Sequence, residues 1–286
     1  MTELYIEPFS GLSGDMLLSG LCGLADYYDE IIELPAKLNL PDGKVVIDTV
    51  NKNGIVCKHV RIVDLNDSQD HDHVHHHDAD QKHHGHDHHH EHDHHHHHHH
   101  EHDHHHKHAH RHLKEIILII DQAGISDRAK EIAKEIFTII GKSESKIHNI
   151  DLDKIHFHEV SGVDSILDIV GCAVLIDRLE ITKTYSDPIC TGFGMVKTQH
   201  GLLPVPAPAT ADILMHMPTY PGDEKGERVT PTGAAILKYL NPDFSAREIQ
   251  RDKIAYGPGK KDFIGPNVVR LSILTNVKKK PKHHQH

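Results

Sequence analysis

Residues Leu4–Leu24 read LYIEPFSGLSGDMLLSGLCGL, and this stretch sets the character of the fold. It begins as a candidate strand, passes through the Gly- and Ser-rich loop Ser10–Asp15, and continues as an apolar helix. Such a loop suits an anion, because glycines allow close backbone approach and the free amides of a helix start point outward. It is not a Walker A loop, since the GK[ST] ending is absent. A helix start capped by Ser13 or Asp15 is an equally good interpretation.

The segments that follow predict an α/β fold. Val45–Val50 and Ile55–Val63 are rich in β-forming residues, and Asn53-Gly54 between them predicts an antiparallel hairpin. Beyond residue 113 the chain becomes helical, with Ser126 as a candidate N-cap, and Val268–Leu274 is a final strand. We therefore expect a sheet of mixed direction with helices packed against it.

A histidine-rich insertion interrupts this pattern at His71–His112, which reads HDHVHHHDADQKHHGHDHHHEHDHHHHHHHEHDHHHKHAHRH. It has almost nothing apolar to bury, so we expect it to be disordered and to hang from the sheet. Neutral imidazoles suit Ni, Cu, Zn and Co, and neighbouring carboxylates can accept hydrogen bonds from the distal ring nitrogens. The tract therefore predicts binding of several divalent ions; an inert spacer is the alternative, and its internal position argues against an affinity tag. Its candidate ligands include His88, His89, His90, His96, His97 and His98.

The insertion divides the chain into four parts. Residues 1–70 and 113–275 are expected to form one α/β domain, 71–112 the metal-binding insertion, and 276–286 a disordered basic tail. The formal charge is -11 with His neutral, so nucleic-acid binding is not expected. No signal peptide or bilayer-spanning apolar run is visible, so we expect a cytoplasmic protein that does not contact a membrane. The 4 cysteines are widely spaced, and we interpret them as buried reduced thiols rather than a disulfide or zinc framework.

A second metal-ligand pattern follows the first helices. His156 and His158 would share one face of a strand, and Glu159 comes next. Asp164 and Asp168 are four residues apart and hence on one face of the following helix. This set is a plausible site for a divalent ion. The alternative is a His pair at the edge of the core and a helix N-cap at Asp164.

The C-terminal half contains another candidate phosphate-binding helix start. Thr230–Leu237 reads TPTGAAIL, in which a hydroxyl residue and a proline precede a helix. Such a start could hold a phosphate, whereas simple capping by Thr230 explains the same pattern. Ala255–Lys261 is expected to be a flexible, basic loop.

Several long motifs, read in order, resemble one protein family. They are FSGLSGDM, FHEVSGVDSILDIVG, GFGMVKTQHGLLPVPAPATADIL, RVTPTGAAIL and GPNVVRLSIL, and they span nearly the whole chain outside the insertion. In these motifs, and in the position and composition of the insertion, the chain resembles the LarC family of nickel insertion proteins. Ser161 and Gly265 stand where the family pattern has Gly and Arg. The second difference would remove a guanidinium that could bind phosphate.

The resemblance implies an enzyme that inserts Ni²⁺ into pyridinium-3,5-bisthiocarboxylic acid mononucleotide, forming Ni–S bonds and a Ni–C bond in a CTP-dependent reaction. The product would serve lactate racemase. Longer relatives continue into a C-terminal domain associated with CTP and Mn²⁺ or Mg²⁺, and we expect full activity to need that domain. The expected partners are the mononucleotide, the extended form of the same protein, the sulfur-inserting enzyme, lactate racemase and a second copy in a homo-oligomer.

The resemblance also suggests roles for the candidate residues, with the tract gathering Ni²⁺ for a fixed site. That site is expected to comprise His156, His158 and Glu159, supported by Asp164 or Asp168. His158 or His200 would remove the ring proton as the Ni–C bond forms, because imidazole titrates near neutrality. The phosphate would be held by Ser10, Ser13, Asp15, Thr230 and Thr232. Two alternatives stay open: a nickel storage or delivery protein without catalysis, and a metal-dependent phosphate-ester hydrolase.

Overall fold

The computed structural model describes residues 2–66, 111–157 and 160–279. The six tract histidines named as candidate ligands, together with His158 and Glu159, lie outside these residues. The chain on either side of the insertion belongs to one unit, formed by residues 1–65 and 109–286.

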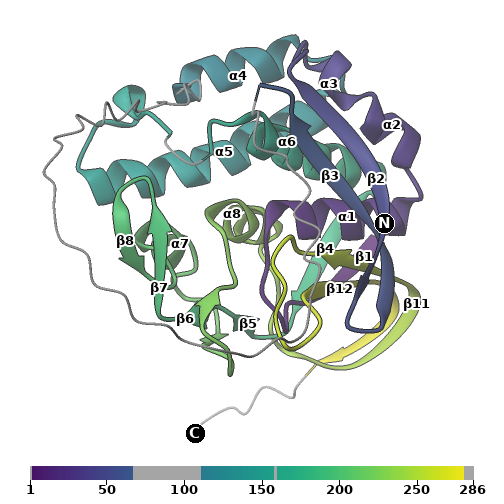
Figure 1. Ribbon diagram of the computed structural model, residues 1–286. Helices are drawn as coiled ribbons and strands as arrows, with labels where there is room; N and C mark the ends of the chain where they lie inside the picture. Colours follow the sequence, from purple (N-terminus) through teal and green to yellow (C-terminus); the bar gives the residue numbers. More distant parts are fainter. Residues whose placement is uncertain (1, 67–110, 158–159, 280–286) are drawn as a thin grey trace, which may run out of the picture. The chain divides into compact units, whose positions relative to one another are not determined.

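A four-stranded mixed sheet with the order β11-β12-β1-β4 forms the base of the unit (Figure 1). The central strand β1 (Thr2–Glu7) pairs in parallel with β4 (Ile181–Ser186). On its other side β1 pairs antiparallel with β12 (Val268–Lys279), which in turn pairs antiparallel with β11 (Ala246–Pro258). The predicted mixed sheet is thus confirmed, and β12 extends to Lys279, four residues beyond the predicted end of the domain at residue 275.

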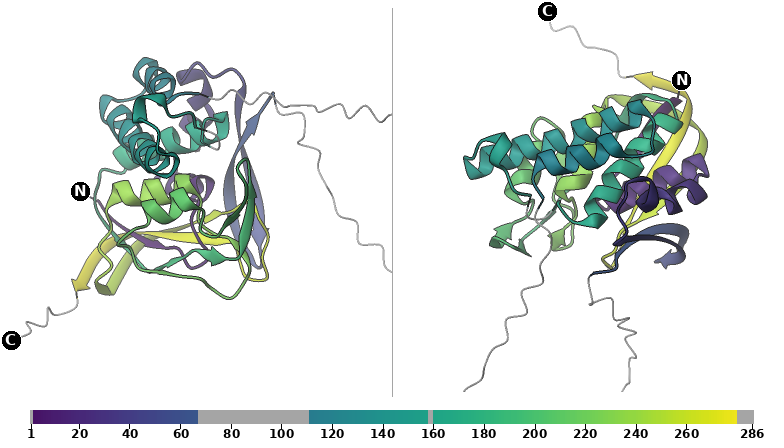
Figure 2. Two further views of the ribbon diagram at one scale, coloured as in Figure 1. Left: turned by 90° about the vertical axis from the view of Figure 1, so that its left-hand side faces the viewer. Right: turned by 90° about the horizontal axis from the view of Figure 1, so that it is seen from above.

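Side chains of β1 alternate between the two faces of this sheet, as the strand geometry requires. Leu4 and Ile6 are fully buried in the main core, whereas Tyr5 points to the opposite face and packs with Tyr185 and Leu274. The helices pack on the sheet face that carries Leu4 and Ile6, and the main hydrophobic core lies between them and the sheet (Figure 2).

Helix α1 (Gly14–Ala25) lies between the sheet and the other helices. It packs against β11 and β12 on one side and against α6 (Val163–Arg178) on the other, while α5 (Asp127–His148) covers α6 and α8 (Pro231–Leu240). A helix covered on all sides must be apolar all round, which explains why nearly every residue of α1 is buried.

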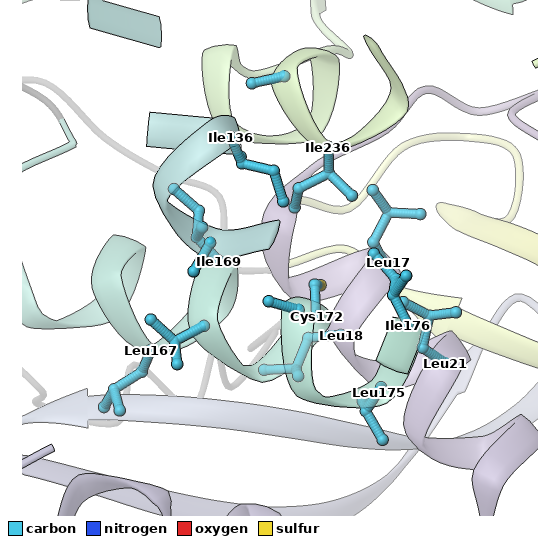
Figure 3. Packing of buried hydrophobic residues seen from close by; sticks show 14 of the residues in the cluster. Leu17, Leu18, Leu21, Ile136, Leu167, Ile169, Cys172, Leu175, Ile176 and Ile236 are labelled. Carbon is cyan, nitrogen blue, oxygen red and sulfur yellow. The ribbon is translucent and has the colours of Figure 1, made fainter. Parts of the chain in front are cut away.

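The core where these helices meet is built from Leu, Ile and Cys side chains. Figure 3 shows Leu17, Leu18 and Leu21 of α1 beside Cys172 and Ile176 of α6. Ile136 of α5 and Ile236 of α8 close the same cluster.

The contact between α1 and the sheet is unusually close at Gly257. A Cβ atom built on this residue would lie 1.8 Å from the carbonyl oxygen of Met16, so only glycine fits.

The remaining elements are short and complete the periphery. Strands β2 (Gly43–Lys52) and β3 (Ile55–Asp64) form a separate antiparallel hairpin. The other two-stranded sheets are β5 (Ile189–Cys190) with β9 (Thr219–Tyr220), β6 (Gly192–Phe193) with β10 (Gly226–Glu227), and β7 (Met195–Thr198) with β8 (Gly201–Pro204). The remaining helices are α2 (Tyr28–Ile32), α3 (Leu34–Lys37), α4 (Leu113–Gln122), α7 (Pro208–Ile213) and the 3-10 turn η1 (Leu152–Lys154).

Both ends of the chain that flank the insertion are hydrogen-bonded to the unit. After β3, the amide of Leu65 donates to the carbonyl of Asp42 at 2.7 Å. Before α4, Arg111 Nη1 donates to the carbonyl of Ser161, also at 2.7 Å. The folded unit therefore fixes the points at which the chain leaves and returns.

The hairpin with its Asn53-Gly54 turn is confirmed, and Ser126 caps α5 by accepting from the amide of Ala129. The prediction of a loop over Ala255–Lys261 was wrong in its first half, because β11 runs to Pro258. Among the described residues, no helix is long and apolar enough to cross a bilayer.

Candidate functional site

Three helices begin at the wall of one cavity of about 270 Å³. They are α1, α6 and α8, and the loop between β11 and β12 closes the cavity. Its lining includes Ser13, Gly14, Asp15, Asp164, Asp168, Glu227, Arg228, Thr230, Thr232, Lys260, Lys261, Phe263 and Asn267. Helix N-termini carry partial positive charge and free amides, so their convergence favours an anionic ligand.

Cationic side chains add to this positive field. Lys260 and Lys261 are more than half exposed at the cavity, with their Nζ atoms 3.9 Å from Asp164 and 3.8 Å from Glu227. These long, half-solvated pairs are weak, so both ammonium groups can turn toward a ligand at small cost.

Arg228 is held far more tightly than the lysines. Its side chain is only 7% exposed, its guanidinium lies 3.5 Å from the centre of the Phe263 ring, and Nη2 is 3.3 Å from Glu224. Nη1 donates to Ser10 Oγ at 2.7 Å. Ser10 is therefore buried directly behind the cavity and supports one of its walls.

The two candidate phosphate-binding helix starts differ in their hydroxyl groups. Thr230 Oγ1 accepts from the amide of Gly233 at 3.2 Å, which is an ordinary N-cap. Ser13 occupies the N-cap position of α1 but makes no capping hydrogen bond, and its hydroxyl donates to Asp15 Oδ1. In α1 the amide of Met16 donates instead to Asp15 Oδ1 at 3.0 Å, so each of the two helix starts has a first-turn amide bonded to a side chain.

Two buried carboxylates lie at the cavity floor. Asp15 and Asp168 are 7% and 9% exposed. The carboxylate of Asp168 lies against the start of α1, since a Cβ on Gly14 would come 2.7 Å from its Oδ2. His59 of β3 is buried behind them, with Nε2 3.7 Å from Asp15 Oδ2, too far for a hydrogen bond.

The two carboxyl groups differ in charge state. Burial raises the pKa of Asp15, but interactions with His59, Ser13 and Lys260 outweigh it and hold the pKa below its ordinary value. Burial, together with the negative charge of Asp15, raises the pKa of Asp168 well above its ordinary value. Asp168 is therefore the more readily protonated of the two carboxyl groups.

The loop that carries the lysines is itself supported by the β2–β3 hairpin. Asn53 Nδ2 in the turn donates to the carbonyl of Ile264 at 2.6 Å, and Lys52 Nζ donates to Asp262 at 2.6 Å. The hairpin therefore fixes one rim of the cavity.

Comparison with known proteins identifies the family. The family described as "Nickel insertion protein" matches residues 4–286. The chain belongs to this nickel insertion family. A "putative nickel insertion protein" of Dictyoglomus thermophilum is 37% identical over 278 residues, which is 96% of this chain and 61% of that protein.

Other relatives of the family carry a more specific name. Proteins called "pyridinium-3,5-bisthiocarboxylic acid mononucleotide nickel insertion protein" occur in Desulfitobacterium hafniense and Alkaliphilus metalliredigens. They are 37% and 39% identical to this chain over 96% and 98% of its length, and the match covers 58% and 62% of their own. The chain thus spans about three fifths of the curated relatives that it matches. No solved structure matches.

The structure brings together most of the described residues that sequence reasoning proposed for this family member. The cavity is lined by Ser13, Asp15, Asp164, Asp168, Thr230 and Thr232.

His156 lies elsewhere, exposed before α6. Its ring stacks on His112 with centroids 3.7 Å apart, and the two residues form a single antiparallel bridge in place of the predicted strand. His200 lies in the turn between β7 and β8, where its ring is 4.8 Å from that of His148. Neither histidine is among the residues lining the cavity.

A complete protein-only metal site is not seen in the part of the chain that the structure describes. Within it, no three His, Cys, Asp or Glu side chains converge to hold an ion. The predicted ligand set with His158 and Glu159 lies partly outside the described residues and stays a prediction.

Sequence reasoning missed four residues that shape the site: His59, Arg228, Lys260 and Lys261. The Gly-Pro-Gly-Lys-Lys run was noted as basic, but nothing local indicates that it folds over the helix starts. His59 could have been found from its place in the predicted strand, because a polar residue at an inward-facing position needs a polar partner.

Proposed function

We propose that this chain takes part in inserting nickel into pyridinium-3,5-bisthiocarboxylic acid mononucleotide, the activity named for the relatives in D. hafniense and A. metalliredigens. The observation that supports it is one cavity in which helix starts and lysines face buried carboxylates. An anionic nucleotide and a divalent ion need these two environments side by side.

The phosphate of the mononucleotide binds at the positive side of the cavity. The start of α1 offers amides that Ser13 does not cap, and Lys260 and Lys261 lie beside them. Thr232 lines the same wall, while Ser10 acts through Arg228 rather than by direct contact.

Nickel is the cargo in this proposal. The histidine-rich segment gathers Ni²⁺, and His156, with the predicted partners His158 and Glu159, receives an ion next to the entrance to α6. The two sulfur atoms of the substrate then bind nickel, and a base accepts the ring proton as the Ni–C bond forms. His158 is the preferred base, because His200 lies at the β7–β8 turn outside the cavity lining.

CTP dependence forms part of the proposal, with Mg²⁺ or Mn²⁺ as the counterion of the nucleotide. We assign CTP to the region present in the longer relatives and to no described residue of this chain. The sulfur-inserting enzyme supplies the substrate, lactate racemase uses the product, and a homo-oligomer carries out the reaction in the cytoplasm.

The test supplies the bisthiocarboxylate mononucleotide, Ni²⁺ and CTP, with and without the remaining region of a longer relative. Product is measured by mass spectrometry and by activation of apo-lactate racemase. Lys260→Ala should raise the KM for the mononucleotide about tenfold, equivalent to ~1.4 kcal/mol. Lys114→Ala, at an exposed lysine paired with Asp153, is the matched control and should change nothing. Absence of product under every condition would refute the proposed function.

A storage or delivery protein remains the second candidate because of the histidine content. Deletion of residues 71–108 separates the two: insertion at high Ni²⁺ should survive the deletion, whereas a storage function should disappear. A metal-dependent phosphate-ester hydrolase would instead release phosphate from nucleotides with Mn²⁺ or Zn²⁺, and we expect no turnover in that assay.

A further inference from the structure

Three buried polar atoms beside the cavity lack partners. Within the described residues, no hydrogen bond reaches Asp15 Oδ2, Asp168 Oδ1 or His59 Nε2. All three side chains are more than nine-tenths buried, and both carboxylates line the cavity. A buried carboxylate oxygen without a partner is costly, so this arrangement calls for a positive ligand.

No cationic side chain in the described part of the chain hydrogen-bonds these two carboxylate oxygens, although the charge of Lys260 lowers the pKa of both Asp15 and Asp168. Lys260 lies 3.9 Å from Asp164 at the exposed rim, and Lys261 lies 3.8 Å from Glu227. Arg228 is engaged by Ser10, Glu224 and the Phe263 ring. Within the described residues, the lysine and arginine side chains therefore leave Asp15 Oδ2 and Asp168 Oδ1 without a hydrogen bond.

We propose that Asp15 and Asp168 hold a hard divalent cation, Mg²⁺ or Mn²⁺, which joins the two carboxylates to the phosphate of the bound mononucleotide. Carboxylate oxygens are the preferred ligands of these ions. Mg²⁺ in particular is bound by one or two carboxylates, several waters and a substrate phosphate, rather than by a cage of protein ligands. The identity of the phosphate rests on the proposed function; the cation site does not.

This arrangement fits the absence of a three-residue metal cluster among the described residues. Two protein carboxylates contribute charge of -2, which one divalent ion neutralises, and the phosphate supplies the further oxygens. The phosphate then meets the start of α1 and the two lysines without repulsion from the floor. The cation thus explains how an anion can bind in a cavity that is lined by two acidic residues.

Neighbouring residues position the carboxylates of Asp168 and Asp15. Gly14 permits Asp168 to lie against the start of α1, because any larger residue would clash with Oδ2. Ser13 donates to Asp15 Oδ1, while Asp15 Oδ2 faces His59 Nε2 at 3.7 Å, beyond hydrogen-bond distance. His59 and Ser13 act as positioning residues in this view.

The test measures binding of Mn²⁺ alone to the full chain, by the electron paramagnetic resonance signal of free Mn²⁺, with and without inorganic phosphate. The wild-type chain should bind one ion whose affinity rises with phosphate, and Mn²⁺ should raise phosphate affinity by the same factor. Asp15→Asn and Asp168→Asn should each weaken this phosphate-linked ion at least tenfold. The histidine-rich segment contributes the same background in every variant.

Asp153→Asn is the matched control, since Asp153 is an exposed carboxylate paired with Lys114 and does not line the cavity. It should retain the phosphate-linked ion. Equal loss in all three variants, or unchanged binding in Asp15→Asn and Asp168→Asn, overturns the assignment to the buried pair. A site that takes Ni²⁺ but neither Mn²⁺ nor Mg²⁺ also overturns it.

Both substitutions preserve side-chain size, and thermal unfolding will show that the variants fold. Should they fail to fold, the wild-type chain decides, because Mn²⁺ binding that does not respond to phosphate overturns the proposal. Nickel insertion is assayed separately. Insertion that persists in Asp168→Asn after Mn²⁺ binding is lost rejects a role for the cation in holding the substrate phosphate, whereas intact Mn²⁺ binding without any insertion rejects the proposed function alone.

Discussion

At the residue scale, Glu7 shows how this protein compensates the negative charge of a buried carboxylate. Glu7 is 5% exposed on β1, and Arg270 of β12 donates to both of its oxygens, from Nε at 2.7 Å and from Nη2. Arg251 of β11 lies 3.1 Å away. Within the described residues, Asp168 Oδ1 has no hydrogen bond whereas Glu7 has two arginine partners, and this contrast singles out the cavity pair.

Glu7→Gln should therefore lower the free energy of unfolding by about 2 kcal/mol, because charge-assisted hydrogen bonds to a buried group are lost. The measurement is urea unfolding at neutral pH. Glu3→Gln on the same strand is the control, since Glu3 is partly exposed and 3.7 Å from Lys183, and it should cost less than about 1 kcal/mol. Equal losses in the two variants would contradict this account.

Cys22 predicts how stability depends on alkaline pH. Burial raises the pKa of this thiol to about 12, and the side chain is inaccessible to solvent. Above pH ~8.5 the unfolded chain releases the thiol proton while the folded protein keeps it. The folded state then binds more protons than the unfolded state, so stability falls as pH rises.

Cys22→Ala should remove this contribution. Between pH 8 and 10, the difference in unfolding free energy between wild type and variant should shrink by about 2 kcal/mol, as measured by urea unfolding. A constant difference across this range would show that the thiol titrates alike in both states.

At the scale of the element, α5 depends on a single hydroxyl at its start. Ser126 Oγ accepts from the amide of Ala129 at 3.1 Å and donates to Asp177 Oδ2 at 2.5 Å. Ser126→Ala should lower the free energy of unfolding by about 1 kcal/mol, because an amide of the first turn loses its partner. Ser126→Thr keeps the hydroxyl and should stay within a few tenths of wild type. Neither change should alter phosphate binding, since Ser126 does not line the cavity.

Elements with local signals were predictable, and elements specified by distant contacts were not. The turn at Asn53-Gly54 needs positive φ at both residues, and the structure has 51° and 91° there, so the hairpin could be predicted from two letters. Strand β11 carries polar residues such as Arg251, Asp252 and Lys253, and only its pairing with β12 makes it a strand. A loop was therefore predicted from the sequence at the C-terminal end of this strand, where β11 runs on to Pro258.

The residues of the candidate site were likewise predictable only where the sequence signal is local. Asp164 and Asp168 were expected on one face of a helix, and both line the cavity. Lys260 reaches the same cavity from the far end of the sequence, and His59 stands behind Asp15 from another sheet. Sequence periodicity does not predict that these residues lie close together, because only the tertiary fold brings them to one place.

At the scale of the whole molecule, the folded unit and the histidine-rich segment should be separable. Deleting residues 71–108 leaves the Leu65 and Arg111 hydrogen bonds in place and only shortens the connecting loop. The free energy of unfolding should change by less than about 1 kcal/mol. Thermal or urea unfolding checks this, and calorimetry should show that far fewer Ni²⁺ ions bind. A loss of several kcal/mol would mean that the segment packs against the unit.

The hydrogen bonds at Leu65 and Arg111 have a consequence for how such proteins diversify. When both ends of a connecting chain are held in place, doubling its length raises the free energy of loop closure by only about 0.6 kcal/mol. A lineage can therefore lengthen or shorten the histidine-rich segment by small genetic steps, while the cavity and its lining are inherited unchanged.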